Sequence, residues 1–428
     1  MQLTKVNDSF EILKFIFALP TVVQNLTSLC HSLVRHTIMQ LIILSISLVL
    51  FILYATLLIY YRLSWLKIPY YTPGEAPPPP TKISVIIPAR NEEKNIGACL
   101  DSIFNQTLSK ELYEVIVIDD HSTDTTAAIV KTYEAKNVTL IELKDTVQHQ
   151  TTNSYKKKAI ETAIAHSKGD LIVTTDADCI VVPGWLDTLL SFHHETNAVF
   201  IAMPVSYSCS NHFLEIFQSL DFMTLQGITG AAVYQRIHSM CNGANIAYSK
   251  KAFYEVGGFT GIDAIASGDD MLLMHKIWKQ HPGAVYFLQS RKVIVQTQPM
   301  KTIKDFFNQR IRWASKADKY DDKRIFLVLM LVYFFNVLLL VLPIVSIFNN
   351  VQLSIFSFQF PLLQLWFALL IGKTIIELYF LYPVAKFFNL QKLLWWFPLA
   401  QPFHILYTVI AGWLGKFGSY QWKDRKVK

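Results

Sequence analysis

The sequence is poor in charged residues and in cysteine. Only 17% of its 428 residues are charged, against about 25% in an average soluble globular chain, while 52% are hydrophobic. This balance is typical of membrane proteins and excludes a disordered, highly charged chain. The cysteines form no C-x-x-C pair, which excludes a zinc ribbon and a disulfide scaffold and indicates reduced thiols. They are Cys30, Cys99, Cys179, Cys209 and Cys241.

Two common nucleotide-binding motifs are also missing. The chain contains neither G-x-x-x-x-G-K-[ST] nor G-x-G-x-x-G, so a P-loop and a dinucleotide-binding Rossmann site are both excluded. No internal repeat is visible. The net charge of +7 is modest, and part of it flanks hydrophobic segments. We therefore expect a membrane and not a nucleic acid as the partner of these basic residues.

Three long segments contain no charged residue: Thr37–Tyr61, Ile325–Gly372 and Leu393–Gly415. Because about 20 apolar residues cross a bilayer core, the first predicts a transmembrane helix. It is too long for the hydrophobic part of a signal peptide and lacks a small-residue cleavage site, so we expect an uncleaved anchor. The second is long enough for two spans, joined by a polar turn near Asn349 and Asn350.

The third segment, Leu393–Gly415, has two interpretations. Pro398 and Pro402 would leave backbone groups unpaired in a lipid-facing helix, and the basic C-terminal tail favours the cytosolic side. We therefore predict a re-entrant or interfacial segment with a cytosolic tail; a plain fourth span with an external tail is the alternative. Lys373 and Glu377 would then pair within or at the end of the preceding span.

A soluble block with alternating strand and helix patterns lies between the membrane segments, at residues 81–323. It follows the proline-rich stretch Pro73–Pro80, which predicts a stiff spacer. A helical pattern begins at Ile96, with Asn91 as the expected cap. Strands separated by helices indicate parallel β-α-β units and an α/β sheet. The buried strand runs are Ile83–Ala89, Glu114–Asp120, Asp170–Asp178 and Asn197–Val205.

Acidic residues stand at the ends of three of these strands. One such residue after a strand is often only a helix cap. Three acidic ends on one sheet edge, where ligands of open α/β sheets bind, would repel one another unless a cation lay between them. We therefore expect a divalent cation with oxygen ligands, completed by substrate phosphates. The residues concerned are Glu92, Asp119, Asp120, Asp176 and Asp178.

Taken in order, these motifs resemble the family 2 glycosyltransferases with a GT-A fold. The segments VIIPARNEE, YEVIVIDDHSTDTT and TTDADCIVVPGWL are followed by CNGANIAYSKKAFYEVGGF, SGDDMLL and QRIRW. The resemblance covers about residues 81–313. With the flanking helices, the chain is most similar to the membrane-embedded branch that includes cellulose, hyaluronan and ceramide-glucosyl synthases. This implies an α/β GT-A fold, a Rossmann-like nucleotide-sugar-binding sheet flanked by transmembrane helices.

The resemblance implies a nucleotide site at the strand ends. Asp119 or Asp120 matches the position that holds the uracil or the ribose. Asp176 and Asp178 match the D-x-D pair, which binds Mn²⁺ or Mg²⁺ and through it the diphosphate. Lys156 either approaches the nucleotide or is one of three solvated lysines. The first nucleotide-contacting turn is matched by Pro88, Ala89, Asn91 and Glu92.

The resemblance also implies the catalytic groups. Asp270 matches the general base of the family's E-D motif, but Asp269 replaces the glutamate, which leaves the role of Asp269 open. Trp313 either stacks on a sugar or anchors the chain at the membrane interface. The Q-x-x-R-W motif and its neighbour, expected to contact the diphosphate and the sugar, comprise Gln309, Arg310, Arg312 and Trp313.

The sequence thus predicts an inverting transferase with a nucleotide-sugar donor, in particular a UDP-sugar, and a lipid or glycan acceptor. A processive polysaccharide synthase, a non-catalytic membrane scaffold and a nucleotidyltransferase are the alternatives. We expect an integral protein of the bacterial inner membrane with a cytosolic catalytic domain. Its predicted parts are an N-terminal segment (1–36), a transmembrane helix (37–61), a linker (62–80), the GT-A domain (81–300), an interfacial helix (301–323), a C-terminal membrane region (324–415) and a basic tail (416–428).

Overall fold

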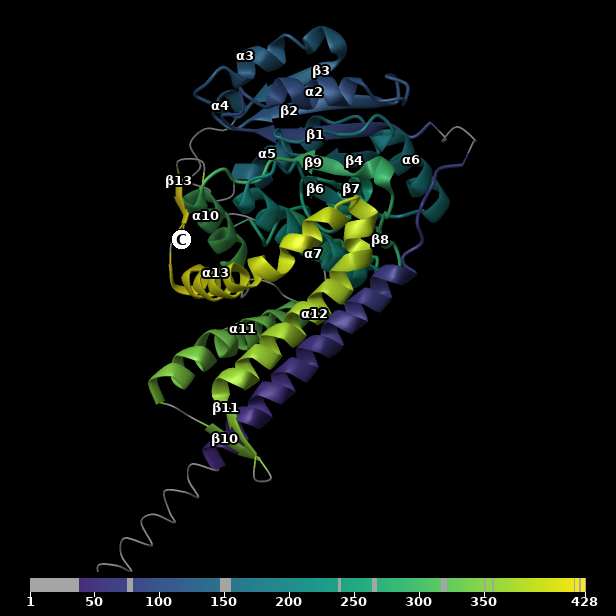
Figure 1. Ribbon diagram of the computed structural model, residues 1–428. Helices are drawn as coiled ribbons and strands as arrows, with labels where there is room; N and C mark the ends of the chain where they lie inside the picture. Colours follow the sequence, from purple (N-terminus) through teal and green to yellow (C-terminus); the bar gives the residue numbers. More distant parts are fainter. Residues whose placement is uncertain are drawn as a thin grey trace, which may run out of the picture.

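The protein consists of an α/β domain and a helical bundle that extends from one side of it (Figure 1). The computed structural model describes residues 38–74, 80–146, 155–237, 240–263, 268–316, 322–349, 352–355, 358–418, 420–422 and 425–427. The expected N-terminal segment and most of the proline-rich stretch lie outside the described residues.

A seven-stranded sheet with the order β3-β2-β1-β4-β7-β5-β8 forms the centre of the α/β domain. The strands β3, β2, β1 and β4 are parallel, whereas β7 runs antiparallel to both β4 and β5. The predicted α/β sheet is therefore confirmed. The strands are β1 (Ile83–Ala89), β2 (Tyr113–Asp119), β3 (Val138–Glu142), β4 (Leu171–Thr174), β5 (Phe200–Ala202), β7 (Ile246–Ser249) and β8 (Val285–Phe287).

Helices cover the sheet, and a small parallel pair of strands, β6 (Val205–Tyr207) and β9 (Val295–Thr297), lies beside it. The run Asn197–Val205, expected as one strand, is divided into β5 and β6. Pro204 lies at the break, where its nitrogen has no hydrogen to donate to a neighbouring strand. The helices of this domain are α2 (Ile96–Phe104), α3 (Thr126–Lys131), η1 (Glu134–Lys136), α4 (Leu143–Thr146), α5 (Tyr155–His166), α6 (Trp185–Thr196), α7 (Phe213–Gln235), α8 (Lys250–Glu255), α9 (Asp269–Gln280), η2 (Arg291–Val293) and α10 (Ile303–Ala314).

The sheet reverses its strand order at β1, which lies between β2 and β4. Ala89 at the end of β1 is level with Asp119 at the end of β2, and Ile86 is level with Thr174 at the end of β4. In open α/β sheets such a switch point forms the crevice in which ligands bind. The fold therefore brings the three acidic strand ends to one edge.

Four described helices are long and apolar enough to cross a membrane: Ile38–Lys67, Lys323–Ile347, Leu362–Phe388 and Gln391–Phe417. The bundle consists of the N-terminal helix (Ile38–Lys67), α11 (Lys323–Asn349), the hairpin β10 (Gln352–Ile355) and β11 (Phe358–Pro361), α12 (Leu362–Phe388), η3 (Gln391–Trp396) and α13 (Phe397–Phe417). Two further short strands, β12 (Tyr420–Trp422) and β13 (Arg425–Val427), follow α13.

Two of these helices are longer than the charge-free segments from which they were predicted. The N-terminal helix continues past Tyr61 to Lys67, and within this extension Arg62 lies over the ring of Tyr379, at 3.8 Å from its centroid. Helix α12 continues past Gly372 with Lys373 and Glu377 buried as a pair, 2.7 Å apart. The linker predicted at 62–80 therefore begins as helix.

Helix α13 differs in direction from the other long helices of the bundle. In Figure 1 it runs across the end of the bundle that faces the α/β domain, whereas α11, α12 and the N-terminal helix run along it. It contacts α10, α11 and α7. The interfacial segment stays a prediction, because the helix Gln391–Phe417 is also long and apolar enough to cross a membrane.

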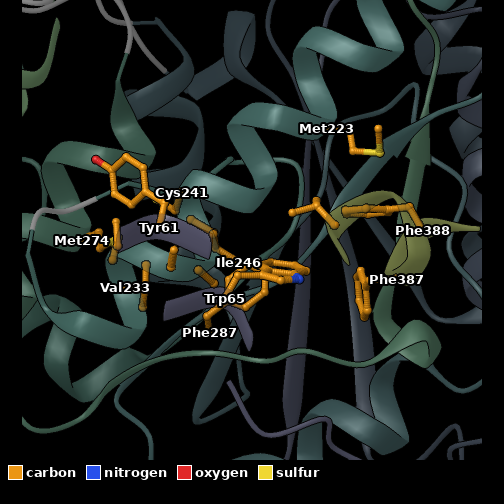
Figure 2. Packing of buried hydrophobic residues seen from close by; sticks show 14 of the residues in the cluster. Tyr61, Trp65, Met223, Val233, Cys241, Ile246, Met274, Phe287, Phe387 and Phe388 are labelled. Atoms are coloured by element: carbon orange, nitrogen blue, oxygen red, sulfur yellow. The ribbon is translucent and has the colours of Figure 1, made fainter. Parts of the chain in front are cut away.

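Aromatic residues join the bundle to the α/β domain. Figure 2 shows Trp65 of the N-terminal helix next to Phe287 of β8, with Phe387 of α12 nearby; the ring centroids lie 6.0 and 5.6 Å from that of Trp65. Gly230 of α7 permits this approach, since a Cβ at its position would come within 2.7 Å of the Trp65 ring. One apolar core therefore extends from the sheet into the bundle.

Candidate active site

The turn after β1 is locked against the turn after β2. Asn91 adopts a left-handed backbone conformation (φ 52°), its N–H donates to Ser122 Oγ at 2.9 Å, and its Oδ1 accepts from the Thr123 N–H at 2.8 Å. The prediction that Asn91 caps the following helix is wrong, because Asn95 occupies the N-cap position. Asn91 instead fixes the turn that contains Glu92 and directly follows Pro88 and Ala89 at the end of β1.

Asp119 and Asp120 end β2 in different surroundings. Both are buried, with exposed fractions of 2% and 6%. Asp119 Oδ2 accepts from the Ser122 N–H at 3.1 Å, and its Oδ1 makes no hydrogen bond. Asp120 Oδ1 lies 3.1 Å from His121 Nδ1, while its carbonyl accepts from Arg90 Nη1 at 2.7 Å. Asp119 thus braces the turn, and Asp120 lies beside a half-exposed histidine.

The D-x-D pair follows β4 at the same edge. Asp176 has 36% of its side chain exposed, and Asp178 is half-buried. The Thr174 hydroxyl donates to the Gly243 carbonyl at 3.0 Å, which holds the loop before β7 beside this strand end. Two carboxylates thus remain accessible where the strand order reverses.

Lys156 of α5 lies between two acidic parts of the site. Its Nζ is 2.7 Å from Asp176 Oδ1 and 3.7 Å from Asp269 Oδ2, and only 21% of its side chain is exposed. Burial lowers the pKa of Lys156, but the charges of the two carboxylates outweigh burial and raise it above its ordinary value. Lys156 is therefore a charged member of the site and not a solvated lysine.

Asp269 and Asp270 begin α9 and face the loop at Gly243. Asp270 Oδ2 accepts from the Gly243 N–H at 2.8 Å, and its Oδ1 accepts from the Met271 N–H at 2.8 Å. Burial and the neighbouring Asp269 charge raise the pKa of Asp270. Burial also acts to raise the pKa of Asp269, but nearby lysines, Lys156 foremost, lower it overall. The two carboxyls therefore differ in proton affinity, as an acid–base site requires.

Lys316, which sequence reasoning missed, stands near this pair. Its Cδ lies 3.4 Å from the point that a Cβ on Gly268 would occupy, directly before Asp269. Burial lowers the pKa of Lys316 to about 8, against the opposing effect of Asp270. The only available signal was its place three residues after the Q-x-x-R-W motif.

Helix α10 presents the Q-x-x-R-W motif next to the α/β domain. The side chain of Trp313 is half-buried and packs against the core of that domain, with its ring 6.2 Å from Phe222. Gln309 Oε1 is 3.5 Å from the Tyr207 hydroxyl. Arg312 is half-buried on the same helix. Trp313 therefore packs on the α/β domain, and its contact with a sugar stays a prediction.

Arg310 has a different place from the one predicted. It is only 4% exposed, its Nη2 forms an ion pair with Asp221 Oδ2 at 2.7 Å, and its guanidinium lies 4.3 Å from the Trp313 ring centroid. Burial lowers the pKa of Arg310, but the Asp221 charge outweighs it and raises the pKa. The expected diphosphate contact therefore does not fit Arg310, because its charge is already neutralised inside the protein.

The two carboxylates that follow β4 suit a cation whose remaining ligands come from a substrate. Among the described residues, no group of three or more His, Cys, Asp or Glu is placed to hold a metal by itself. Mg²⁺ and similar hard cations commonly use one or two carboxylates plus substrate phosphates. The carboxylates of Asp176 and Asp178 suit this arrangement, in which substrate phosphates supply the remaining ligands.

Comparisons with known proteins agree with this architecture. A mannosyltransferase of Pyrobaculum calidifontis, solved in complex with GDP-Man and Mn²⁺, superposes with a TM-score of 0.53 at 19% identity, covering 87% of this chain and 99% of that one. The fold is therefore that of a GT-A glycosyltransferase, with additional helices. The sequence profile of glycosyl transferase family 2 matches residues 84–257, and that of glycosyl transferase family group 2 matches residues 171–414, more than half of the chain. The chain belongs to the family 2 glycosyltransferases.

Curated relatives match over shorter segments. A poly(ribitol-phosphate) beta-glucosyltransferase of Bacillus spizizenii is 39% identical over 97 residues, which are 23% of this chain and 15% of that protein. A 4,4'-diaponeurosporenoate glycosyltransferase of Staphylococcus aureus is 28% identical over 180 residues, 41% of this chain and 46% of that protein. The chain thus spans less than half the length of the curated relatives it matches.

Proposed function

We propose that this protein is an inverting glycosyltransferase that moves one sugar from a nucleotide-sugar donor, a UDP-sugar in particular, to a lipid-linked or membrane-proximal acceptor. The observation that carries the proposal is the meeting of Asp176, Lys156 and Asp269 within ion-pair distance beside Asp270. This cluster connects the strand end suited to a diphosphate with the carboxyl suited to a general base.

In this proposal the donor lies across the switch point. The turn at Asn91 and one of Asp119 and Asp120 hold the nucleoside, and Arg312 contacts the diphosphate. Asp176 and Asp178 would hold Mn²⁺ or Mg²⁺, and such an ion neutralises the charge of the leaving diphosphate. Support for a cation comes from the two accessible carboxylates and from the Mn²⁺ named in the related structure.

Asp270 removes the proton from the acceptor hydroxyl. The acceptor oxygen forms a bond to the anomeric carbon, while the bond from that carbon to the donor phosphate breaks and the diphosphate leaves with the electron pair. The Gly243 and Met271 N–H groups orient the Asp270 carboxylate, and burial raises its proton affinity. Attack from the side opposite the leaving group inverts the anomeric configuration.

We further propose that the α/β domain lies in the cytosol of a bacterium, at the inner membrane. Sugar nucleotides are supplied there, and the four cysteines of the described residues are all free thiols. The acceptor is membrane-bound in this proposal because α10 and α13 place the Q-x-x-R-W motif next to the bundle.

The test is a donor panel. The full chain in detergent is incubated with labelled sugar nucleotides and a native lipid extract, with Asp270→Asn as the matched inactive control. Transfer of one sugar to a lipid, with inversion seen by NMR of the product, supports the proposal. Long polymeric products would point to a processive synthase, and no transfer from any donor would point to a scaffold.

A further inference from the structure

A charge pair is buried in the bundle. Lys373 and Glu377 lie one turn apart on α12, with the Lys373 Nζ 2.7 Å from Glu377 Oε1. The Lys373 side chain has no exposed surface. Tyr54 of the N-terminal helix and Gln401 of α13 both donate hydrogen bonds to Glu377. Ionisable groups inside a membrane bundle are costly and commonly functional, and a buried ion pair rarely adds net stability over apolar packing.

His404 extends this polar cluster from Lys373 in the bundle to Asp221 in the α/β domain. Its Nδ1 lies 3.5 Å from the Lys373 Nζ, and its Nε2 lies 3.9 Å from Asp221 Oδ1. Because an ammonium can only donate, Nδ1 acts as the acceptor and the hydrogen of the neutral ring faces Asp221. Tyr407, one turn further along α13, also donates its hydroxyl to Asp221. A single helix thus connects α12 with α7.

Asp221 connects this polar cluster to the Q-x-x-R-W motif. Its second oxygen pairs with Arg310 at 2.7 Å, and both side chains are about 95% buried, with exposed fractions of 5% and 4%. Arg310 Nη1 donates to Gln309 Oε1 at 2.6 Å, and the guanidinium lies over Trp313. A continuous chain of polar contacts therefore runs from the membrane pair to the first and last residues of the motif.

We propose that Asp221, His404 and Tyr407 are positioning residues, which hold α10 in its working orientation and couple it to the Lys373–Glu377 pair. This inference rests on the proposed glycosyltransferase function. None of the three touches the strand ends where the donor binds. Their loss should therefore leave nucleotide affinity intact and lower turnover, since small displacements of groups beside a reacting centre can reduce rates about 10²-fold.

The first experiment compares Asp221→Asn with Glu215→Gln in full-length protein in phosphatidylethanolamine/phosphatidylglycerol nanodiscs. Glu215 is a matched control because it lies on α7 and also forms an ion pair, with Lys301 at 3.1 Å, outside the polar chain. We expect Asp221→Asn to lower kcat about 10-fold or more and to change UDP affinity less than twofold, whereas Glu215→Gln changes neither. If Asp221→Asn does not fold, Tyr407→Phe replaces it in the test. This variant removes one hydroxyl and keeps the ring, so we expect a smaller loss in kcat.

The second experiment tests the coupling. Lys373→Met and Asp221→Asn are combined, and kcat of the double variant is compared with those of the singles. If one chain of contacts connects them, the double variant falls no further than the worse single variant. Additive losses would overturn the coupling. A lower melting temperature with unchanged kcat of the folded protein would overturn the positioning role.

Hydrogen exchange of backbone amides tests the positioning of α10 independently of the proposed glycosyl transfer. Backbone amides of α10 should exchange faster in Asp221→Asn than in Glu215→Gln, whatever the activity. If the wild-type protein transfers no sugar but the α10 amides still exchange faster in Asp221→Asn, the proposed reaction is wrong and the structural connection stands. Equal exchange in the two variants would overturn the connection itself.

Discussion

Asp270 accepts a hydrogen bond from the backbone N–H of Gly243 at 2.8 Å, which joins the first turn of α9 to the loop before β7. A Cβ on Gly243 would lie 3.4 Å from the Asp270 Cβ, an ordinary van der Waals contact, so the loop packs directly against the first turn of α9. The orientation of Asp270 is therefore set by backbone groups that a side-chain substitution does not remove.

This relationship makes Asp270→Asn an informative variant. The amide has nearly the same shape and its oxygen can still accept from the Gly243 N–H, while only the hydrogen bond from the Met271 N–H is lost, so UDP binding should be close to wild type. It cannot take a proton, and kcat should fall by about 10² or more. Steady-state kinetics and calorimetric UDP binding measure the two effects. A kcat near the wild-type value would assign the base to another group, with Asp269 examined next.

The neighbours of Asp270 should shift the pH profile in opposite directions. The base must be ionised, so activity falls as the pH drops through the raised pKa of Asp270. Lys316 lowers that pKa and Asp269 raises it. Lys316→Met should therefore move the acidic limb of kcat/KM to higher pH, and Asp269→Asn should move it to lower pH. Shifts of the same sign in both variants would contradict this electrostatic account.

Removal of divalent cations should abolish transfer. A chelator leaves the carboxylates of Asp176 and Asp178 without the cation that we propose they share with the diphosphate, and added Mn²⁺ or Mg²⁺ should restore activity. Asp178→Asn and Asp176→Asn should each reduce turnover strongly, whereas Asp187→Asn, on α6 where Thr107 donates to the carboxylate, should not. Full activity of metal-free protein would exclude the cation from the reaction.

The orientation of α13 can be tested by labelling. In a cysteine-free background of intact cells, a cysteine at Lys416 should react with an impermeant maleimide only after permeabilisation, because an interfacial α13 leaves its end on the cytosolic side. A cysteine at Ser354, in the hairpin between α11 and α12, should react without permeabilisation. Labelling at Lys416 in intact cells would instead establish a fourth span.

Close packing of α7 on α12 should make Gly227 intolerant of a side chain. A Cβ there would lie 2.7 Å from Val384 Cγ2 and 2.9 Å from Phe380 Cζ, so Gly227→Ala should destabilise the protein by about 1–3 kcal/mol. Gly97→Ala on α2 is the matched control, since its Cβ would meet nothing closer than 3.8 Å. Melting temperatures in detergent measure the difference, and equal values would show that α12 moves aside.

The sequence alone determined the local and periodic features of this protein. Buried strand runs, acidic strand ends, the Q-x-x-R-W motif and long charge-free segments are all visible as residue patterns, and the described sheet and helices follow them. Even the pairing of Lys373 with Glu377 could be predicted, because residues four apart lie on one face of a helix.

Only the tertiary structure decided the partners of charges that are distant in sequence. Lys156 and Asp176 are adjacent because α5 packs on β1 and β2, next to the end of β4, and Arg310 is neutralised because α7 brings Asp221 to α10. The approach of Lys316 to Asp270 and the crosswise course of α13 depend in the same way on packing between elements. Neither periodicity nor spacing records such contacts, because the distance between two elements is set by the side chains that fill the space between them.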